Sequence, residues 1–109
     1  MITGPKKKVF KRQIINAAFE IARTEGIDQV STRKIAGKIG SSVAPIYVNF
    51  KNIEELIEAL IDRIINVNQQ ILREENTGKP FHDIGRASLR FAIEYSVLFR
   101  DLVIKKIVT

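Results

Sequence analysis

The hydrophobic positions of this chain recur at helical spacing along most of its length. Residues 9–25 follow the i, i+4, i+7, i+8 pattern of a helix with one buried face, through Ile14, Ala18, Ile21 and Ala22. Gly26 follows as a helix stop that can take a positive φ. Because no segment alternates with the period of two that is typical of a half-buried strand, the pattern predicts an all-α protein.

Two short helices are expected after Gly26. The first is STRKIAGKIG, residues 31–40, in which Ser31 or Thr32 can cap the N-terminus and Gly40 ends the helix. A glycine-containing turn between two short helices, after a longer first helix, is typical of a helix-turn-helix. The second short helix of such a pair is the one that enters the major groove of DNA.

The second short helix is expected within SSVAPIYVNF, residues 41–50. With Ser42 as the N-cap, Pro45 falls at the third helical position, where the missing N–H loses no hydrogen bond within the helix. Ile46 and Phe50 are four residues apart and would face inward. The positions that would then point outward are Val43, Ala44, Tyr47 and Val48.

Longer helices are expected in the second half of the chain. One runs from Asn52 or Ile53 to about Glu75 and carries a wide apolar stripe, so more than one of its sides should be covered. The stretch 76–80, NTGKP, is predicted to be a loop, and further helices are expected over Ile84–Ser96 and Val97–Val108.

The composition limits the classes of function that this protein can have. The net charge is +6, and all of the excess lies in residues 1–50, which hold nine Lys or Arg and three Asp or Glu. This asymmetry favours a polyanion-binding module joined to a neutral one. The chain has no cysteine, no apolar run that could span a membrane and no secretory signal, so we expect a cytoplasmic protein. With one histidine and no Gly-rich phosphate loop, we expect neither an enzyme nor a metal or cofactor site.

Residues 11–60 resemble the DNA-binding domain of the tetracycline-repressor (TetR/AcrR) family of bacterial transcription regulators. The resemblance rests on the elements IINAAFEIARTEG, STRKIAGKIG, IYVNF and KNIEELIEAL in this order and at this spacing, and it continues weakly through YSVLFRDLV. It implies an N-terminal arm and helix-turn-helix domain over residues 1–52. Residues 53–109 would then be the start of a helical ligand-binding and dimerisation domain, which is larger in the family.

The resemblance also implies roles for individual residues. Thr32 would cap its helix and donate to a phosphate, Arg33 would reach a base edge or a phosphate, and Tyr47 would place its hydroxyl on the DNA backbone. The complete set of implied DNA contacts is Thr32, Arg33, Ser42, Val43, Ala44, Pro45, Tyr47, Asn49 and Lys51. The basic arm Lys6, Lys7 and Lys8 would add attraction to phosphates that does not depend on sequence.

Two departures from the family pattern bear on affinity and selectivity. At Ile53 the family commonly has a lysine that contacts phosphate, which isoleucine cannot do. Most of the recognition tip is apolar, so base reading would rely on methyl contacts to thymine and on Arg33. These departures favour an alternative, a helical protein–protein interaction module with a degenerate helix-turn-helix.

The second half of the chain leaves two interpretations open. Phe91, Tyr95 and Phe99 repeat at i, i+4, i+8 and could line an effector pocket or simply pack in a core. By the resemblance, the protein would be a repressor that binds double-stranded operator DNA as a homodimer and is released by a small-molecule effector. At 109 residues the chain would be a fragment or a shortened member with an incomplete effector pocket.

Overall fold

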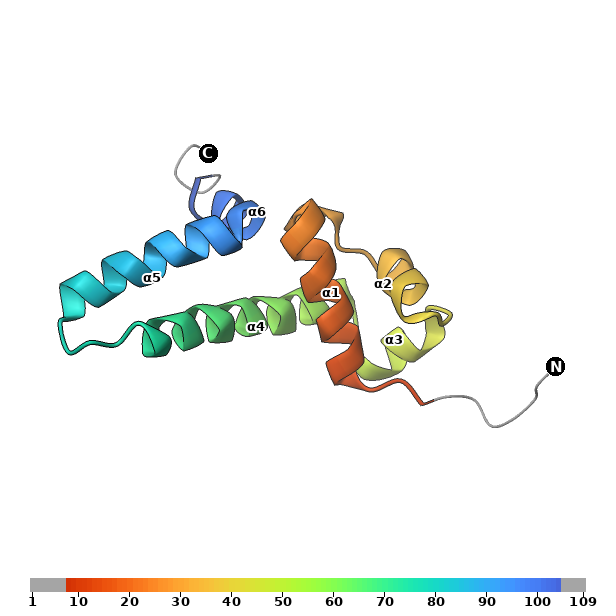
Figure 1. Ribbon diagram of the computed structural model, residues 1–109. Helices are drawn as coiled ribbons and strands as arrows, with labels where there is room; N and C mark the ends of the chain where they lie inside the picture. The colour runs from red at the N-terminus through yellow and green to blue at the C-terminus, as the bar shows by residue number, and fades with distance from the viewer. Residues whose placement is uncertain (1–7, 105–109) are drawn as a thin grey trace.

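The computed structural model describes residues 8–104, and every regular element within this range is helical (Figure 1). In chain order the elements are α1 (Lys11–Glu25), the 3₁₀ turn η1 (Ile27–Gln29), α2 (Thr32–Ile39), α3 (Ala44–Asn49), α4 (Ile53–Glu74), α5 (Pro80–Glu94), α6 (Ser96–Phe99) and the π-helical turn η2 (Arg100–Ile104). The prediction of an all-α fold is therefore confirmed.

The molecule is elongated, with extents of 57 × 32 × 22 Å, because α4 and α5 form a hairpin that projects from the α1–α3 cluster (Figure 1). At the end of α5 the chain returns to the cluster, where α6 packs against α1. One continuous hydrophobic core joins these parts. Its largest fully buried side chains come from α1, α2, α3, α4 and α6: Ile14, Ile35, Ile46, Leu56, Leu60, Ile64 and Leu98.

Local signals in the sequence set several helix ends. The Ser31 hydroxyl accepts a hydrogen bond from the Lys34 N–H at 3.1 Å and caps α2, and the Asn52 side chain accepts one from the Glu55 N–H at 2.9 Å and caps α4. Gly26 ends α1 with φ at 111°, which confirms the expected helix stop with a positive φ. The Ser31 and Asn52 side chains thus satisfy N–H donors that the first turn of a helix leaves unpaired.

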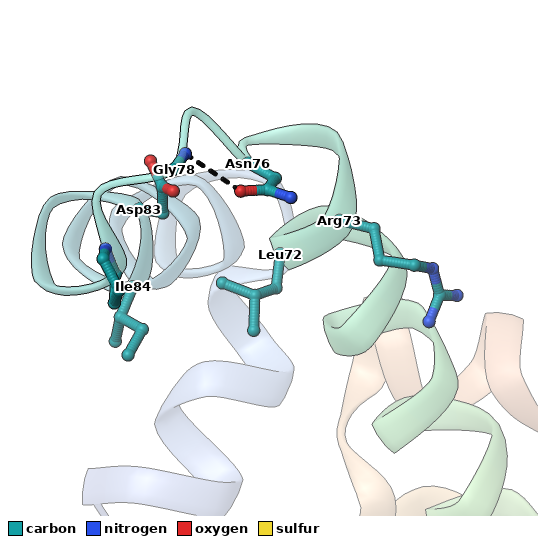
Figure 2. Close-up of a pocket in the computed structure, with 7 residues that line it drawn as sticks. Leu72, Arg73, Asn76, Gly78, Asp83 and Ile84 are labelled. Carbon is teal, nitrogen blue, oxygen red and sulfur yellow. Dashed lines mark hydrogen bonds between the residues drawn. The ribbon is translucent and has the colours of Figure 1, made fainter.

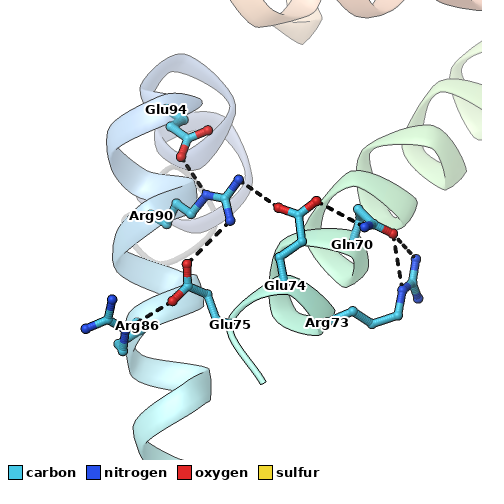
Figure 3. A network of polar contacts seen from close by, with 7 residues as sticks. All are labelled: Gln70, Arg73, Glu74, Glu75, Arg86, Arg90 and Glu94. Atoms are coloured by element: carbon cyan, nitrogen blue, oxygen red, sulfur yellow. Dashed lines mark hydrogen bonds and ion pairs between the residues drawn. The ribbon is translucent and has the colours of Figure 1, made fainter. Parts of the chain in front are cut away.

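Arg90 of α5 forms ion pairs on the surface of the α4–α5 hairpin (Figure 3). Its guanidinium lies 2.8 Å from a Glu74 carboxylate oxygen, 3.4 Å from one of Glu75 and 2.6 Å from one of Glu94. Hydrogen bonds to Glu94 and Glu74 raise the pKa of Arg90 above its ordinary value. The pairs with Glu74 and Glu75 join α5 to the end of α4 and so help to hold the two packed helices in register, whereas the pair with Glu94 lies within α5.

The last two helices differ from their expected bounds. The fifth predicted helix, Ile84–Ser96, begins earlier in the structure, at Pro80, because proline is well suited to the first helical position. It also ends earlier, since Tyr95 has φ −128° and ψ 52°, outside the helical region. The helix expected over Val97–Val108 is a short α6 followed by the π-helical turn, and residues 105–108 lie outside the described range.

Tertiary packing explains the break at Tyr95. Its ring stacks on Phe91 with centroids 5.5 Å apart and meets the edge of Phe19 in α1 at 6.0 Å. The bend then carries Leu98 into full burial in the core. Helix α5 therefore ends at this point because the bend allows contacts with α1. The helical periodicity of this stretch does not reveal the break.

Candidate nucleic-acid interface

Helix α3 presents one buried and one exposed face, as expected. Ile46 and Phe50 are buried in the core, whereas Val48 is 85% and Tyr47 is 54% exposed. Val43 and Ala44 are exposed as well, so the outer face is a small uncharged surface at the edge of the molecule. A helix with its outer face open in this way can be inserted into the major groove.

The start of α3 corrects the prediction for Ser42. The helix begins at Ala44, with Val43 at the N-cap and no side-chain cap, and Pro45 occupies the second helical position rather than the third. The reason lies in the end of α2, where Gly40 takes φ 71° and the Ser41 N–H donates to the Ala36 carbonyl at 2.9 Å. Gly40 and Ser41 therefore close α2, and α3 starts later than the sequence suggested.

The N-terminus of α2 corrects the prediction that Thr32 caps it. Ser31 is the cap, and Thr32, the first residue of α2, has its hydroxyl 3.5 Å from the Tyr47 hydroxyl of α3. Because Ser31 does the capping, the Thr32 hydroxyl is free of that role and lies at the same edge of α3 as Tyr47. Each of these hydroxyls can donate a hydrogen bond to a phosphate oxygen.

Two cations of this region, Arg23 and Lys34, form ion pairs with acidic side chains of residues 8–104. Glu20 lies 2.6 Å from Arg23, whose hydrogen bond lowers the Glu20 pKa, and Glu25 lies 2.7 Å from Lys34. Within residues 8–104, no ion pair is formed by the exposed cations Lys8, Lys11, Arg12, Arg33, Lys38 and Lys51. These groups give the helix-turn-helix a positive surface that can attract phosphates.

Asn49 is half-buried, and its amide group is directed at the protein itself. The Nδ2 group donates to the Pro45 carbonyl at 2.8 Å and to the Val9 carbonyl at 3.3 Å. Next to it a surface hollow of about 620 Å³ is bordered by Lys8 and Val9 and by residues of the turn and of α3. The other two lysines of the predicted basic arm, Lys6 and Lys7, lie outside the described residues.

The departure at Ile53 has a structural reason. Ile53 is half-buried and packs against the hydrophobic core at the start of α4. Just before it, the Lys51 N–H donates to a Glu55 carboxylate oxygen at 3.1 Å while the Lys51 side chain is exposed. At this helix end Lys51 thus presents an exposed cation, and Ile53 contributes to packing.

The three aromatic residues proposed for an effector pocket occupy different places. Phe91 and Phe99 line a partly open hollow of about 240 Å³ together with Ile64, Leu102 and others. Tyr95 is not among its lining residues and packs between Phe91 and Phe19. The structure thus brings Phe91 and Phe99 together around a small space.

A further hollow of about 320 Å³ lies at the α4–α5 loop, the end of the hairpin that is far from the helix-turn-helix (Figure 1, Figure 2). Leu72 and Ile84 give it an apolar lining. The α4–α5 loop forms part of its wall, and within this loop the Gly78 N–H donates to the Asn76 side-chain oxygen at 3.1 Å (Figure 2).

Two further properties concern the described part of the chain. None of its helices is long and apolar enough to cross a membrane. Within the same residues, no group of three or more His, Cys, Asp or Glu side chains is placed so that it could hold a metal ion.

Comparison with known families agrees with this geometry. The sequence model described as "Bacterial regulatory proteins, tetR family" matches residues 14–60, which run from α1 into α4 and include α2 and α3. Residues 14–60 of the chain belong to the tetR family. The resemblance seen in the sequence is therefore confirmed, and the family's helix-turn-helix domain corresponds to α1–α3 and the start of α4.

Individual relatives match more or less of the chain. It is 33% identical over 63 residues to the HTH-type nicotine-responsive transcriptional repressor HdnoR of Paenarthrobacter nicotinovorans, a match that covers 58% of this chain and 31% of that protein. It is 28% identical over 96 residues to Tetracycline repressor protein class C of Escherichia coli, covering 86% of this chain and 42% of the relative. The nucleoid occlusion factor SlmA of Pasteurella multocida is 26% identical over 98 residues, 84% of this chain and 49% of that protein.

The chain thus spans less than half the length of each of these relatives. No solved structure matches it.

Proposed function

We propose that this chain is a DNA-binding transcriptional regulator whose α3 enters the major groove, and that it acts as a repressor. The observation that supports this function is the exposed, uncharged outer face of α3, bordered by cations that no acid within residues 8–104 pairs with. Relatives in the family are named as transcriptional repressors, which favours the same conclusion. Phosphates would supply most of the affinity, and the groove-facing side chains would supply selectivity.

The proposed contacts divide by chemistry. The hydroxyls of Thr32 and Tyr47, which lie 3.5 Å apart, would hold one phosphate strand. Arg33 is exposed one position further along α2 and would reach a guanine edge or the same backbone. Apolar atoms of Ala44 and Val48 would contact thymine methyl groups, so we expect shape and A·T content to contribute to operator choice.

Regulation would come from the helices after α3. In the proposed mechanism, a homodimer sets two α3 helices on half-sites about 34–36 Å apart, and an effector favours a spacing that no longer fits. The hollow between Phe91 and Phe99 is the proposed start of the effector site. Its volume of about 240 Å³ is below the usual range for a small-molecule site, so further chain would have to complete it.

The test is binding to mixed-sequence duplex DNA across a salt series, measured by fluorescence anisotropy. The wild type should bind with log affinity falling linearly against log salt concentration, and Arg33→Ala/Tyr47→Phe should bind clearly more weakly. Lys79→Ala is the control for lost charge, because Lys79 lies in the α4–α5 loop far from α3. Equal affinity of the double variant and the Lys79→Ala control would contradict the proposed interface.

A second candidate function is a protein–protein interaction module, favoured by exposed apolar side chains on α5. Phe81 is 92%, Ile93 is 70% and Leu89 is 62% exposed. Under this alternative, neither the wild type nor the double variant binds duplex DNA at low salt, and Leu89→Ser rather than Arg33→Ala weakens binding to the partner protein.

A further inference from the structure

The segment before α1 is attached to α3 by one side chain. Asn49 donates from Nδ2 to the Pro45 carbonyl, four residues earlier in α3, and to the Val9 carbonyl, forty positions away in the sequence. Asn49 is half-buried, so these hydrogen bonds are partly shielded from water. The backbone at Val9 is therefore held beside the last turn of α3.

The same attachment fixes where Lys8 lies. Lys8 borders the hollow of about 620 Å³ whose other walls are Val9, the turn between α2 and α3, and the α3 residues Ala44, Pro45, Val48 and Asn49. Lys8 is exposed, and its ammonium lies 5.4 Å from the centre of the Phe10 ring. No carboxylate within residues 8–104 forms an ion pair with it, so the charge is available to an anion.

Lys8 and Thr32 lie at opposite edges of the exposed face of α3. At 100° per residue, Ala44 and Val48 form the middle of that face, Tyr47 lies at one edge, and Pro45 and Asn49 lie at the other. The Tyr47 edge adjoins Thr32 of α2, whereas the Asn49 edge adjoins the segment at Val9. A helix in the major groove has a sugar–phosphate strand on each side, and each edge therefore faces a different strand.

We infer that Asn49 is a positioning residue that holds Lys8 against the second phosphate strand of the bound duplex. This inference rests on the proposed DNA-binding function. It differs from a merely attractive basic tail, because the contact depends on a hydrogen bond from α3. Asn49 itself acts through Lys8, since both hydrogen bonds recorded for its amide nitrogen go to the protein's own carbonyl groups.

The test is a double-mutant cycle of Lys8→Ala and Asn49→Ser, with anisotropy of a mixed-sequence duplex over a salt series. Serine at this position can still bond the Pro45 carbonyl within the helix, but it is too short to keep the Val9 bond. Losing one phosphate contact should make the slope of log affinity against log salt shallower by about 0.9, which is about eightfold in affinity near 0.1 M salt. We expect each single variant to show this loss, and the double variant to show little more than either one.

Two controls accompany the cycle. Arg33→Ala acts at the opposite edge of α3, so its effect should multiply with that of Asn49→Ser rather than overlap with it. Thermal unfolding by circular dichroism should show that all variants are folded at the binding temperature, and a general loss of fold would not change the salt slope selectively.

The outcomes separate this inference from the function on which it rests. If the wild type binds and Lys8→Ala weakens binding by the same factor in the wild-type and in the Asn49→Ser background, Asn49 does not position Lys8 and the inference fails alone. It also fails alone if Lys8→Ala leaves affinity and slope unchanged. If the wild type does not bind duplex DNA at all, both the function and the inference are overturned.

Discussion

Replacing Gly26 by alanine should cost this small protein a large part of its stability. Gly26 has φ 111° and ψ 154°, a backbone conformation open almost only to glycine, which strains alanine by about 1–3 kcal/mol. A Cβ atom there would lie 3.2 Å from the Asp101 carboxylate oxygen that accepts the Ile27 N–H at 2.9 Å. Loss of that charged hydrogen bond adds about 1.5–3 kcal/mol, so we expect the unfolding free energy to fall by about 2.5–6 kcal/mol in total.

Urea unfolding followed by far-UV circular dichroism measures this change, and thermal unfolding should show a drop of roughly 8 °C or more. Gly37→Ala is the matched control, because Gly37 lies inside α2 and a Cβ there meets no atom within 4 Å. Alanine suits a helix interior better than glycine, so this control should gain about 0.5–1 kcal/mol. If Gly26→Ala stays within about 0.5 kcal/mol of the wild type, the assigned strain and the role of Asp101 are refuted.

Two further predictions use the cap of α2 and the α4–α5 loop. Ser31→Ala should lower the unfolding free energy by about 1 kcal/mol, because it removes the cap of α2. Thr32→Val should instead weaken DNA binding at nearly unchanged stability. If Thr32→Val lowers the unfolding free energy and Ser31→Ala does not, Thr32 is the cap after all. Hydrogen bonds from the Thr77 hydroxyl and N–H lower the pKa of Asp83, so its stabilisation is complete above about pH 4 and is lost as pH falls through the lowered value. The difference in unfolding free energy between wild type and Asp83→Asn, measured by urea unfolding, should therefore become smaller as the pH falls. A difference that stays the same at every pH would contradict this.

Much of the candidate interface could be predicted from the sequence because it depends on local signals. The four-residue spacing of Ile46 and Phe50 predicted which face of α3 is buried, and the order of motifs predicted the family. The predicted start of α3, with Ser42 as the N-cap, was wrong because Ser42 and Val43 are both compatible with a helix start. The choice between them depends on how the turn closes α2, and that geometry is not visible in residue types.

The sequence by itself determined the helices, the stop at Gly26, the match of residues 14–60 to the tetR family and the concentration of positive charge in residues 1–50. Hydrophobic periodicity and turn residues carry this information because they act over a few residues. Only the tertiary structure decided the attachment of Asn49 to Val9 and of Asp101 to Ile27, across 40 and 74 positions of sequence. Such contacts form only after the helices pack, and since a polar side chain can serve many partners, its type does not reveal which one the fold brings within reach.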